Sequence, residues 1–219
     1  MKIINFPFEL LILVMSVCSC TRTYVYLVSY PYDLKLLNNT SVTIVGSDGL
    51  VLKGFIKTFN EKYENKHSFT TNYVTLFKNK LSQSGQFSLV HADTSYTWNL
   101  IKSFVGSKED FFIIDSLFAK NNSDYIINIH PMEISNRFLN NTGTDANGNA
   151  MTTRKETCVV KARFQIIDRI SRKPILEFES GGEKAVSFFN YKATLENAIL
   201  TSMDHAVLYL QSGLTKFKK

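Results

Sequence analysis

The sequence has few of the residues from which metal sites, disulfides and catalytic centres are built. Its 219 residues include three cysteines and four histidines, and none of them stands in HxxxH, HExxH or CxxC spacing, the spacings typical of zinc sites. The GxSxG of hydrolases and the glycine-rich loops of nucleotide-binding proteins are also missing. These absences predict no metal, no cofactor and no enzyme.

One residue pair leaves a catalytic alternative open. His91 and Asp93 stand two residues apart at the end of an expected strand, where a base and a carboxylate can form a dyad. No nucleophile or third partner is signalled beside them, so a surface position for His91 is the simpler interpretation. An envelope hydrolase that uses this pair stays as an alternative.

Positive charge is present but scattered. The formal net charge is +6 and the isoelectric point is near 9.1, which suits an anionic partner. The only tight basic cluster is the end of the chain, Lys216, Lys218 and Lys219, which we interpret as a solvated tail. No basic stripe with interleaved aromatics emerges, so we expect no nucleic-acid partner.

Long apolar runs are missing as well, and the longest lies at the amino terminus. Residues 3–17 are mostly apolar but are interrupted by Asn5, Pro7 and Glu9, which makes them too short for a membrane-spanning helix. With Lys2 before them they have the size and order of a secretory signal peptide. An ordinary secretory signal and a buried amino-terminal helix are the alternatives.

The residues that follow resemble a bacterial lipobox. "VCSC", residues 17–20, ends in Ser19 before Cys20, and the lipoprotein signal peptidase needs a small residue before the cysteine that it leaves acylated. Val17 before Cys18 is too bulky for the same role. We therefore predict signal cleavage between Ser19 and Cys20, and lipid attachment at Cys20.

This prediction sets the expected domain organisation and location. Residues 1–19 form a lipoprotein signal peptide, 20–40 a lipid-anchored tether, 41–213 an α/β domain and 214–219 a basic tail. Within the tether, the aromatic residues and Pro31 of segment 21–40 suggest an extended arm or an edge strand. No aspartate follows Cys20; by resemblance to enterobacterial lipoproteins, this favours the periplasmic side of the outer membrane. The mature chain keeps Cys158 as its only other cysteine, which we expect to be a buried hydrophobe without a disulfide.

Hydrophobic periodicity predicts a mixed β-sheet with packed helices. Spacing of apolar residues indicates helices over 69–84, 94–123 with a break at 106–110, and 192–211, with Gly85 and Gly213 as caps. Alternation and β-branched runs indicate strands over 41–46, 50–59, 86–92, 121–135, 157–168 and 175–186. The first two strands flank a turn signal, Asp48-Gly49, that suggests a hairpin. Gly181-Gly182 suggests a bulge or a strand end. Residues 136–156 are rich in Asn, Gly and Thr, so we expect them to be a mobile loop.

Three segments and a closing amphipathic helix, in this order, resemble a known domain. They are "SGQFSLVHAD", "SDYIINIHPMEIS" and "VVKARFQIIDRISRKPIL", and they are similar to the TolB amino-terminal-like α/β domain over roughly residues 40–212. That fold occurs in the curli secretion lipoprotein CsgG, in a lipoprotein activator of penicillin-binding proteins and in exopolysaccharide-export lipoproteins.

The resemblance implies a function by binding. It predicts a non-catalytic accessory of an envelope secretion or glycan-assembly machine, which holds a protein partner or self-associates through a sheet edge or the 136–154 loop. The alternative within the same resemblance is an oligomeric secretion-channel subunit like the curli lipoprotein.

Overall fold

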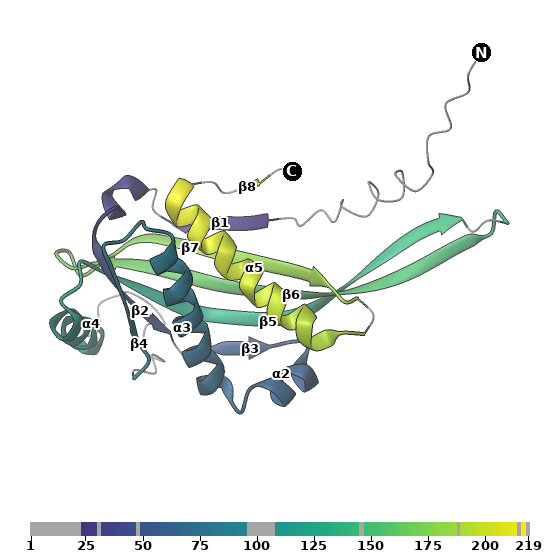
Figure 1. Ribbon diagram of the computed structural model, residues 1–219, viewed down its shortest axis with the longest axis horizontal. Helices are drawn as coiled ribbons and strands as arrows, with labels where there is room; N and C mark the ends of the chain where they lie inside the picture. Colours follow the sequence, from purple (N-terminus) through teal and green to yellow (C-terminus); the bar gives the residue numbers. More distant parts are fainter. Residues whose placement is uncertain are drawn as a thin grey trace, which may run out of the picture.

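A mixed eight-stranded sheet organises the chain (Figure 1). The computed structural model describes residues 23–29, 32–46, 49–95, 108–144, 147–187, 189–213 and 216–217. The elements are β1 (Thr23–Ser29), η1 (Leu34–Leu37), β2 (Ser41–Gly46), β3 (Leu50–Leu52), α2 (Ile56–Lys62), α3 (Lys66–Gln83), β4 (Leu89–Asp93), α4 (Lys108–Asn121), β5 (Tyr125–Thr144), β6 (Ala150–Asp168), β7 (Pro174–Ala185), α5 (Tyr191–Ser212) and β8 (Lys216–Phe217). The mixed α/β class predicted from periodicity is confirmed.

The sheet has the strand order β4-β2-β5-β6-β7-β1-β8, with β3 also paired to β5. β4, β2 and β5 run parallel, and every pair from β5–β6 to β1–β8 is antiparallel. β2 and β3 both run parallel to β5, at Val42–Tyr125 and at Leu50–Met132. The hairpin expected between these two strands is therefore wrong. β2 is buried from Val42 to Gly46, as suits a parallel strand covered on both faces.

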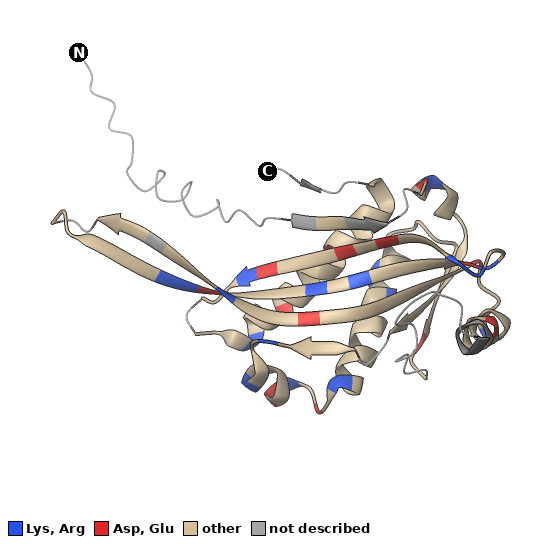
Figure 2. Cartoon of the chain, turned by 180° about the vertical axis from the view of Figure 1, so that it is seen from behind, with Lys and Arg blue, Asp and Glu red and all other residues tan. Residues whose placement is uncertain are grey.

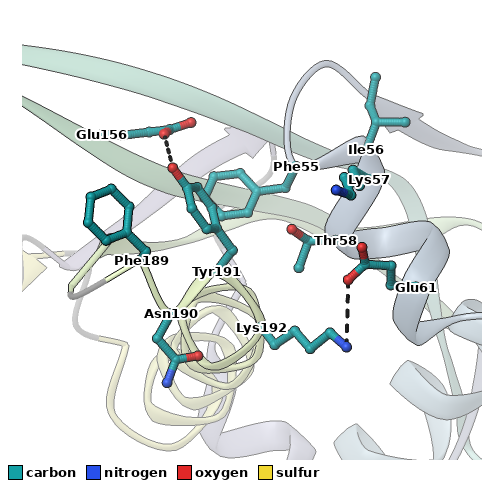
Figure 3. A pocket seen from close by; sticks show the side chains of 10 residues that line it. All are labelled: Phe55, Ile56, Lys57, Thr58, Glu61, Glu156, Phe189, Asn190, Tyr191 and Lys192. Atoms are coloured by element: carbon teal, nitrogen blue, oxygen red, sulfur yellow. Dashed lines mark hydrogen bonds and ion pairs between the residues drawn. The ribbon is translucent and has the colours of Figure 1, made fainter.

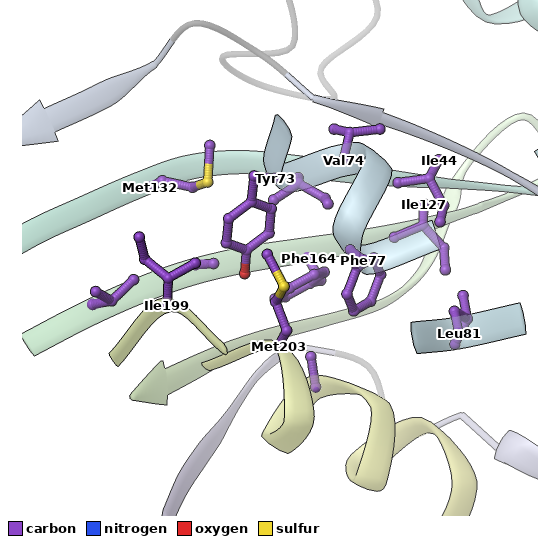
Figure 4. Close-up of a cluster of buried hydrophobic side chains, with 14 of the residues drawn as sticks. Ile44, Tyr73, Val74, Phe77, Leu81, Ile127, Met132, Phe164, Ile199 and Met203 are labelled. Carbon is purple, nitrogen blue, oxygen red and sulfur yellow. The ribbon is translucent and has the colours of Figure 1, made fainter. Parts of the chain in front are cut away.

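The main core lies between one face of the sheet and the helices α2, α3 and α5. Tyr73, Phe77 and Leu81 of α3 are buried there, as their helical spacing predicts. The predicted stripe of α5 is buried opposite them, at Leu195, Ala198, Ile199, Met203, Ala206 and Leu210. Figure 4 shows Phe77 and Met203 beside Phe164 of β6. Cys158 shares this face and is fully buried and free, which confirms its predicted packing role.

Local capping sets the ends of the two long helices. The Asn65 side chain accepts a hydrogen bond from Ser68 N at the start of α3, and the Asn190 side chain does so from Ala193 N at the start of α5. Gly85 and Gly213 follow the two helices with φ of +69° and +68°, the left-handed geometry in which glycine carries no steric cost. Both predicted glycine caps are confirmed.

α4 packs on the opposite face of the sheet. Its Ile114, Leu117 and Phe118 contact Val45, Ile126 and Ile167 in a second buried cluster. This confirms the later part of the helical prediction for 94–123, whereas Trp98, Ile101, Phe104 and Val105 lie outside the described residues. Charged residues recur along the long strands (Figure 2). They form ion pairs between β6 and β7 such as Arg163–Glu177 and Lys161–Glu179.

The amino-terminal segment expected to be a tether contributes to the fold from Thr23 onward. β1 pairs with β7 from Tyr24–Gly181 to Ser29–Glu177. Leu37 of η1 is fully buried, and Val25 of β1 nearly so. The edge strand suggested for this segment is therefore present as β1.

The segment expected to be a mobile loop is the largest difference from prediction. β5 continues past a register shift between Ile129 and Met132 to Thr144, and it pairs with β6 throughout that length. Residues 136–156 are thus mostly the outer half of a β-hairpin. The Asn-Gly pair at 147–148 is a strong hairpin turn signal, and the alternating threonines beside it suit strands.

Candidate functional site: an extended arm and a groove at its base

The outer half of the β5–β6 hairpin extends away from the rest of the fold (Figure 1). The last β7 residue paired with β6 is Ala185, opposite Thr157. Beyond it β5 and β6 continue as seven pairs, from Phe138–Glu156 to Thr144–Ala150, and no third strand among the described residues joins them. We call residues 138–144 and 150–156 the arm. Isolated two-stranded ribbons are marginally stable in water, so the arm is a candidate contact surface.

The arm exposes apolar side chains on both of its faces. Phe138, Leu139 and Met151 are 43%, 41% and 52% exposed. The guanidinium of Arg154 lies 3.7 Å from the ring centroid of Phe138 on the face that continues toward the helices. Alternation along the strands puts Leu139 and Met151 on the other face.

A groove lies at the base of the arm on the helix side. Two cavities of about 620 and 410 Å³ share Glu156, Phe189 and Tyr191, so they adjoin. We call them together the basal groove, of which Figure 3 shows the larger cavity. The remaining lining residues come from α2 and its start, from the start of α5 and from the arm: Phe55, Ile56, Lys57, Thr58, Glu61, Val186, Asn190, Lys192, Phe138, Arg154 and Lys155.

Glu156 joins the arm to the start of α5. Its Oε2 accepts a hydrogen bond from the Tyr191 hydroxyl at 3.1 Å, and its Oε1 accepts one from Asn136 Nδ2 at 3.1 Å. Its backbone oxygen accepts a hydrogen bond from Val186 N at 2.9 Å. The hydrogen bond to Glu156 also raises the pKa of Tyr191. The groove is therefore shaped before any ligand arrives.

Two phenylalanines in the groove have left-handed backbone geometry. Phe55 and Phe189 both have a φ of 56°, a conformation that costs a bulky L-residue about 1–2 kcal/mol. Phe55 is buried against the Tyr191 ring, with centroids 5.7 Å apart, whereas Phe189 is 86% exposed. Strained residues gather at functional sites, so Phe189 is the residue of this groove that most needs a functional explanation.

Charges of both signs surround the aromatic floor. Glu61 and Lys192 form an ion pair across the groove at 3.6 Å (Figure 3). Lys57, Arg154 and Lys155 add cations to the lining. This mixture suits an amphipathic ligand surface such as a protein segment, with apolar contacts at the centre and polar contacts at the rim.

Asp93, the carboxylate of the dyad considered from the sequence, has a partner on α4. Asp93 is buried at the end of β4, and its Oδ2 accepts a hydrogen bond from Lys120 Nζ of α4 at 2.8 Å. Burial raises the pKa of Asp93, but the hydrogen bonds from Lys120 and Ser95 outweigh it and leave the pKa below its usual value. This carboxylate fastens α4 to the sheet.

Within the part of the chain that the structure describes, no cluster of three or more histidine, cysteine or acidic residues is arranged to hold a metal. Burial raises the pKa of Cys158 to about 12, which leaves it a thiol at neutral pH. Cys18, Ser19 and Cys20 lie outside the described residues. Among the residues described, no helix has both the length and the apolar character to cross a membrane.

Sequence reasoning singled out residues 136–154 as a partner-binding segment but expected a mobile loop there, and it did not identify the groove. The arm had a usable signal in Asn147-Gly148. The groove had no sequence signal, because the successive segments that line it are about 30 to 80 residues apart in the chain.

No protein-family model matches this chain, and no curated protein matches it significantly. Among solved structures, a PelC dodecamer from Paraburkholderia phytofirmans is 14% identical with a TM-score of 0.43 over 86% of this chain and 96% of that one. Lipoprotein GNA1162 from Neisseria meningitidis is 11% identical with a TM-score of 0.34 (75% and 98% covered), and hypothetical protein CT253 from Chlamydia trachomatis is 11% identical with a TM-score of 0.39 (78% and 98%). Likenesses at this level assign neither a family nor a function, and the TolB-like resemblance stays a prediction.

Proposed function

We propose that this chain is a lipid-anchored protein of the bacterial cell envelope that faces the periplasm from the outer membrane and works by binding, without catalysis. Its ligand is a protein segment held in the basal groove and along the arm. The lipobox-like "VCSC" supports the location. The arm carries the binding proposal, because seven strand pairs extend from the fold with exposed apolar side chains and no third strand among the described residues.

The free edge of β6 suits strand addition. Val186 N bonds to Glu156 O, so Glu156 points its backbone groups toward the β7 side, and alternation points those of Arg154 and Thr152 the same way. β7 stops short of these residues. An extended segment continuing the line of β7 would pair there, as in recognition by β-augmentation, and its apolar side chains would meet Phe138 and Phe189.

The first experiment tests the anchor. The intact mass of the protein purified from bacterial membranes should correspond to a chain that begins at Cys20 and carries two or three acyl chains. Cys20→Ala should abolish both the cleavage and the added mass, while Cys18→Ala should leave them unchanged. An unacylated wild-type chain would refute the proposed anchor.

The second experiment tests the groove. Phe189→Gly relieves the strain of a left-handed backbone, so the variant should be at least as stable as wild type. It also removes an exposed ring, so partner capture should fall about tenfold or more, as for a hot-spot aromatic. Capture is measured by cross-linking in membranes, with the partner identified by mass. Phe112→Ala, at another largely exposed phenylalanine on α4, is the control. Equal capture by both variants would contradict the proposal.

An oligomeric channel subunit is the second candidate, favoured by the free edges of the arm, since two arms of this chain can also pair with each other. The mass of the detergent-purified protein decides between them. A closed ring with conductance in bilayers supports the channel, and a monomer excludes it.

A further inference from the structure

The basal groove has more cations than acids in its lining. Its charged lining residues are four cations and two acids: Lys57, Arg154, Lys155, Lys192, Glu61 and Glu156. All four cationic residues are exposed, so a ligand can reach them. The lining as a whole therefore attracts negative charge.

The two acidic residues are already engaged within the chain. Both carboxylate oxygens of Glu156 accept hydrogen bonds, one from Tyr191 and one from Asn136. Glu61 pairs with Lys192 at 3.6 Å. Neither acid is therefore left to neutralise the other three cations of the lining.

Those three cations lack an acidic partner. Among the residues that the structure describes, Lys57, Arg154 and Lys155 form no ion pair, and Arg154 is held over the Phe138 ring. The first turn of α5, which also borders the groove, contains no acidic residue, although a helix start favours negative charge. The positive charge at the base of the arm is thus left for a ligand to neutralise.

Strand addition decides where a carboxylate of the ligand would lie. A segment that continues the line of β7 places one residue opposite Arg154 and the next residue opposite Thr153. Because directly opposed side chains share a face, the first residue lies beside Arg154. The second lies on the other face, diagonal to Lys155. Both positions favour a carboxylate and disfavour a lysine or arginine.

We propose that the protein segment bound by the arm and the basal groove is acidic, with neighbouring carboxylates that meet Arg154 and Lys155 on the two faces of the arm. This inference rests on the proposed binding function and names the chemistry of its partner. The part of the segment that lies in the groove meets Lys57 with its charges and Phe189 with its apolar side chains. Each cross-strand pair of opposite charges strengthens binding by up to about fivefold.

The test compares three peptides that bind to the detergent-purified full-length protein. Each end-capped peptide alternates valine and threonine and carries a neutral fluorophore, and its two central residues are both glutamate, both glutamine or both lysine. By fluorescence anisotropy, the glutamate peptide should bind about tenfold more tightly than the glutamine peptide at low salt, and the lysine peptide should bind most weakly. The advantage of the glutamate peptide should shrink at high salt.

Two double variants that remove the same net charge show where the preference arises. Arg154→Gln with Lys155→Gln should reduce the advantage of the glutamate peptide to about twofold or less. Lys35→Gln with Lys173→Gln removes exposed lysines from η1 and from the β6–β7 turn, and this control should keep most of the advantage.

Three results would overturn the acidic segment: equal affinity for the glutamate and glutamine peptides, no binding of any of the three peptides, or equal loss of the advantage in the two double variants. Partner capture by Phe189→Gly decides the proposed function separately. If that variant loses capture while the peptides show no charge preference, the chain binds a protein segment but does not select acidic ones. Unchanged capture refutes the binding function itself.

Discussion

Gly182 lies where α5 crosses β7, at a distance that leaves no room for a side chain. A Cβ at this position would stand 2.1 Å from Ala198 O and 2.5 Å from Ser202 N. The sequence suggested a bulge or strand end here, but β7 continues to Ala185. Gly182 instead admits the helix backbone, because only hydrogen occupies the contact.

We expect Gly182→Ala to lower the free energy of unfolding by about 3 kcal/mol, since the atoms in the way are helix backbone and the helix must shift. Gly143→Ala in the arm is the control, because nothing lies within 4 Å of a Cβ there. Denaturant titration of both variants measures the effect. Equal midpoints would show that α5 moves away at little cost.

At the scale of elements, the arm differs from the rest of the sheet in how it is stabilised. The inner half of β6 has β5 on one side and β7 on the other, with α5 packed against them, whereas the arm has only its own two strands in the described part of the chain. The core should therefore not depend on the arm.

Replacing residues 140–154 with Asn-Gly should leave the free energy of unfolding within about 1 kcal/mol of wild type. Leu139 and Lys155 face each other across β5 and β6, so a two-residue turn closes the shortened hairpin between them. Partner capture should be lost, because the strand edge and Met151 are gone. Thermal melting checks the predicted stability, and the cross-linking assay checks the predicted loss of partner capture. A shortened protein that melts far below wild type would show that the core depends on the arm.

Element prediction from the sequence succeeded where one periodicity dominated. α3, α5 and the β6–β7 hairpin have clear apolar periods of helix or strand type. The two helices also have asparagine before them and glycine after them. Prediction of the arm failed because its strands alternate without burying an apolar face. A strand rich in Asn, Gly and Thr then resembles a loop in composition. Its one clear mark, Asn147-Gly148, is a turn signal that is also common in loops.

At the scale of the whole molecule, the two chain ends complete the sheet. β1 covers the edge of β7, and β8 in turn covers β1. Leu37 and Val25 add buried apolar area that the segment 41–213 lacks. β1 and η1 are thus packed into the fold.

A chain that starts at Ser41 should be less stable than one that starts at Thr23 by at least about 4 kcal/mol, from the lost burial of Leu37 and Val25 at roughly 2 kcal/mol each. We also expect the shorter chain to aggregate through the edge of β7, because it lacks β1. Denaturant unfolding of the two chains, made without residues 1–22, measures the difference. Equal stability would mean that β1 and η1 pack without contributing to the fold.

The amino-acid sequence by itself determined the elements with a single strong period, the glycine ends of the long helices and the burial of Cys158, because these depend on which face of a short segment is apolar. It also carries the predicted signal-cleavage site between Ser19 and Cys20 and the predicted lipid-attachment site at Cys20. Only the tertiary structure decided that β2 and β3 share β5, that residues 138–144 and 150–156 form an arm, and that β8 pairs with β1. It also decided that Phe55, Glu156 and Phe189 line one groove. The physical reason is that pairing depends on contacts between residues far apart in the chain, and no local period encodes the partner.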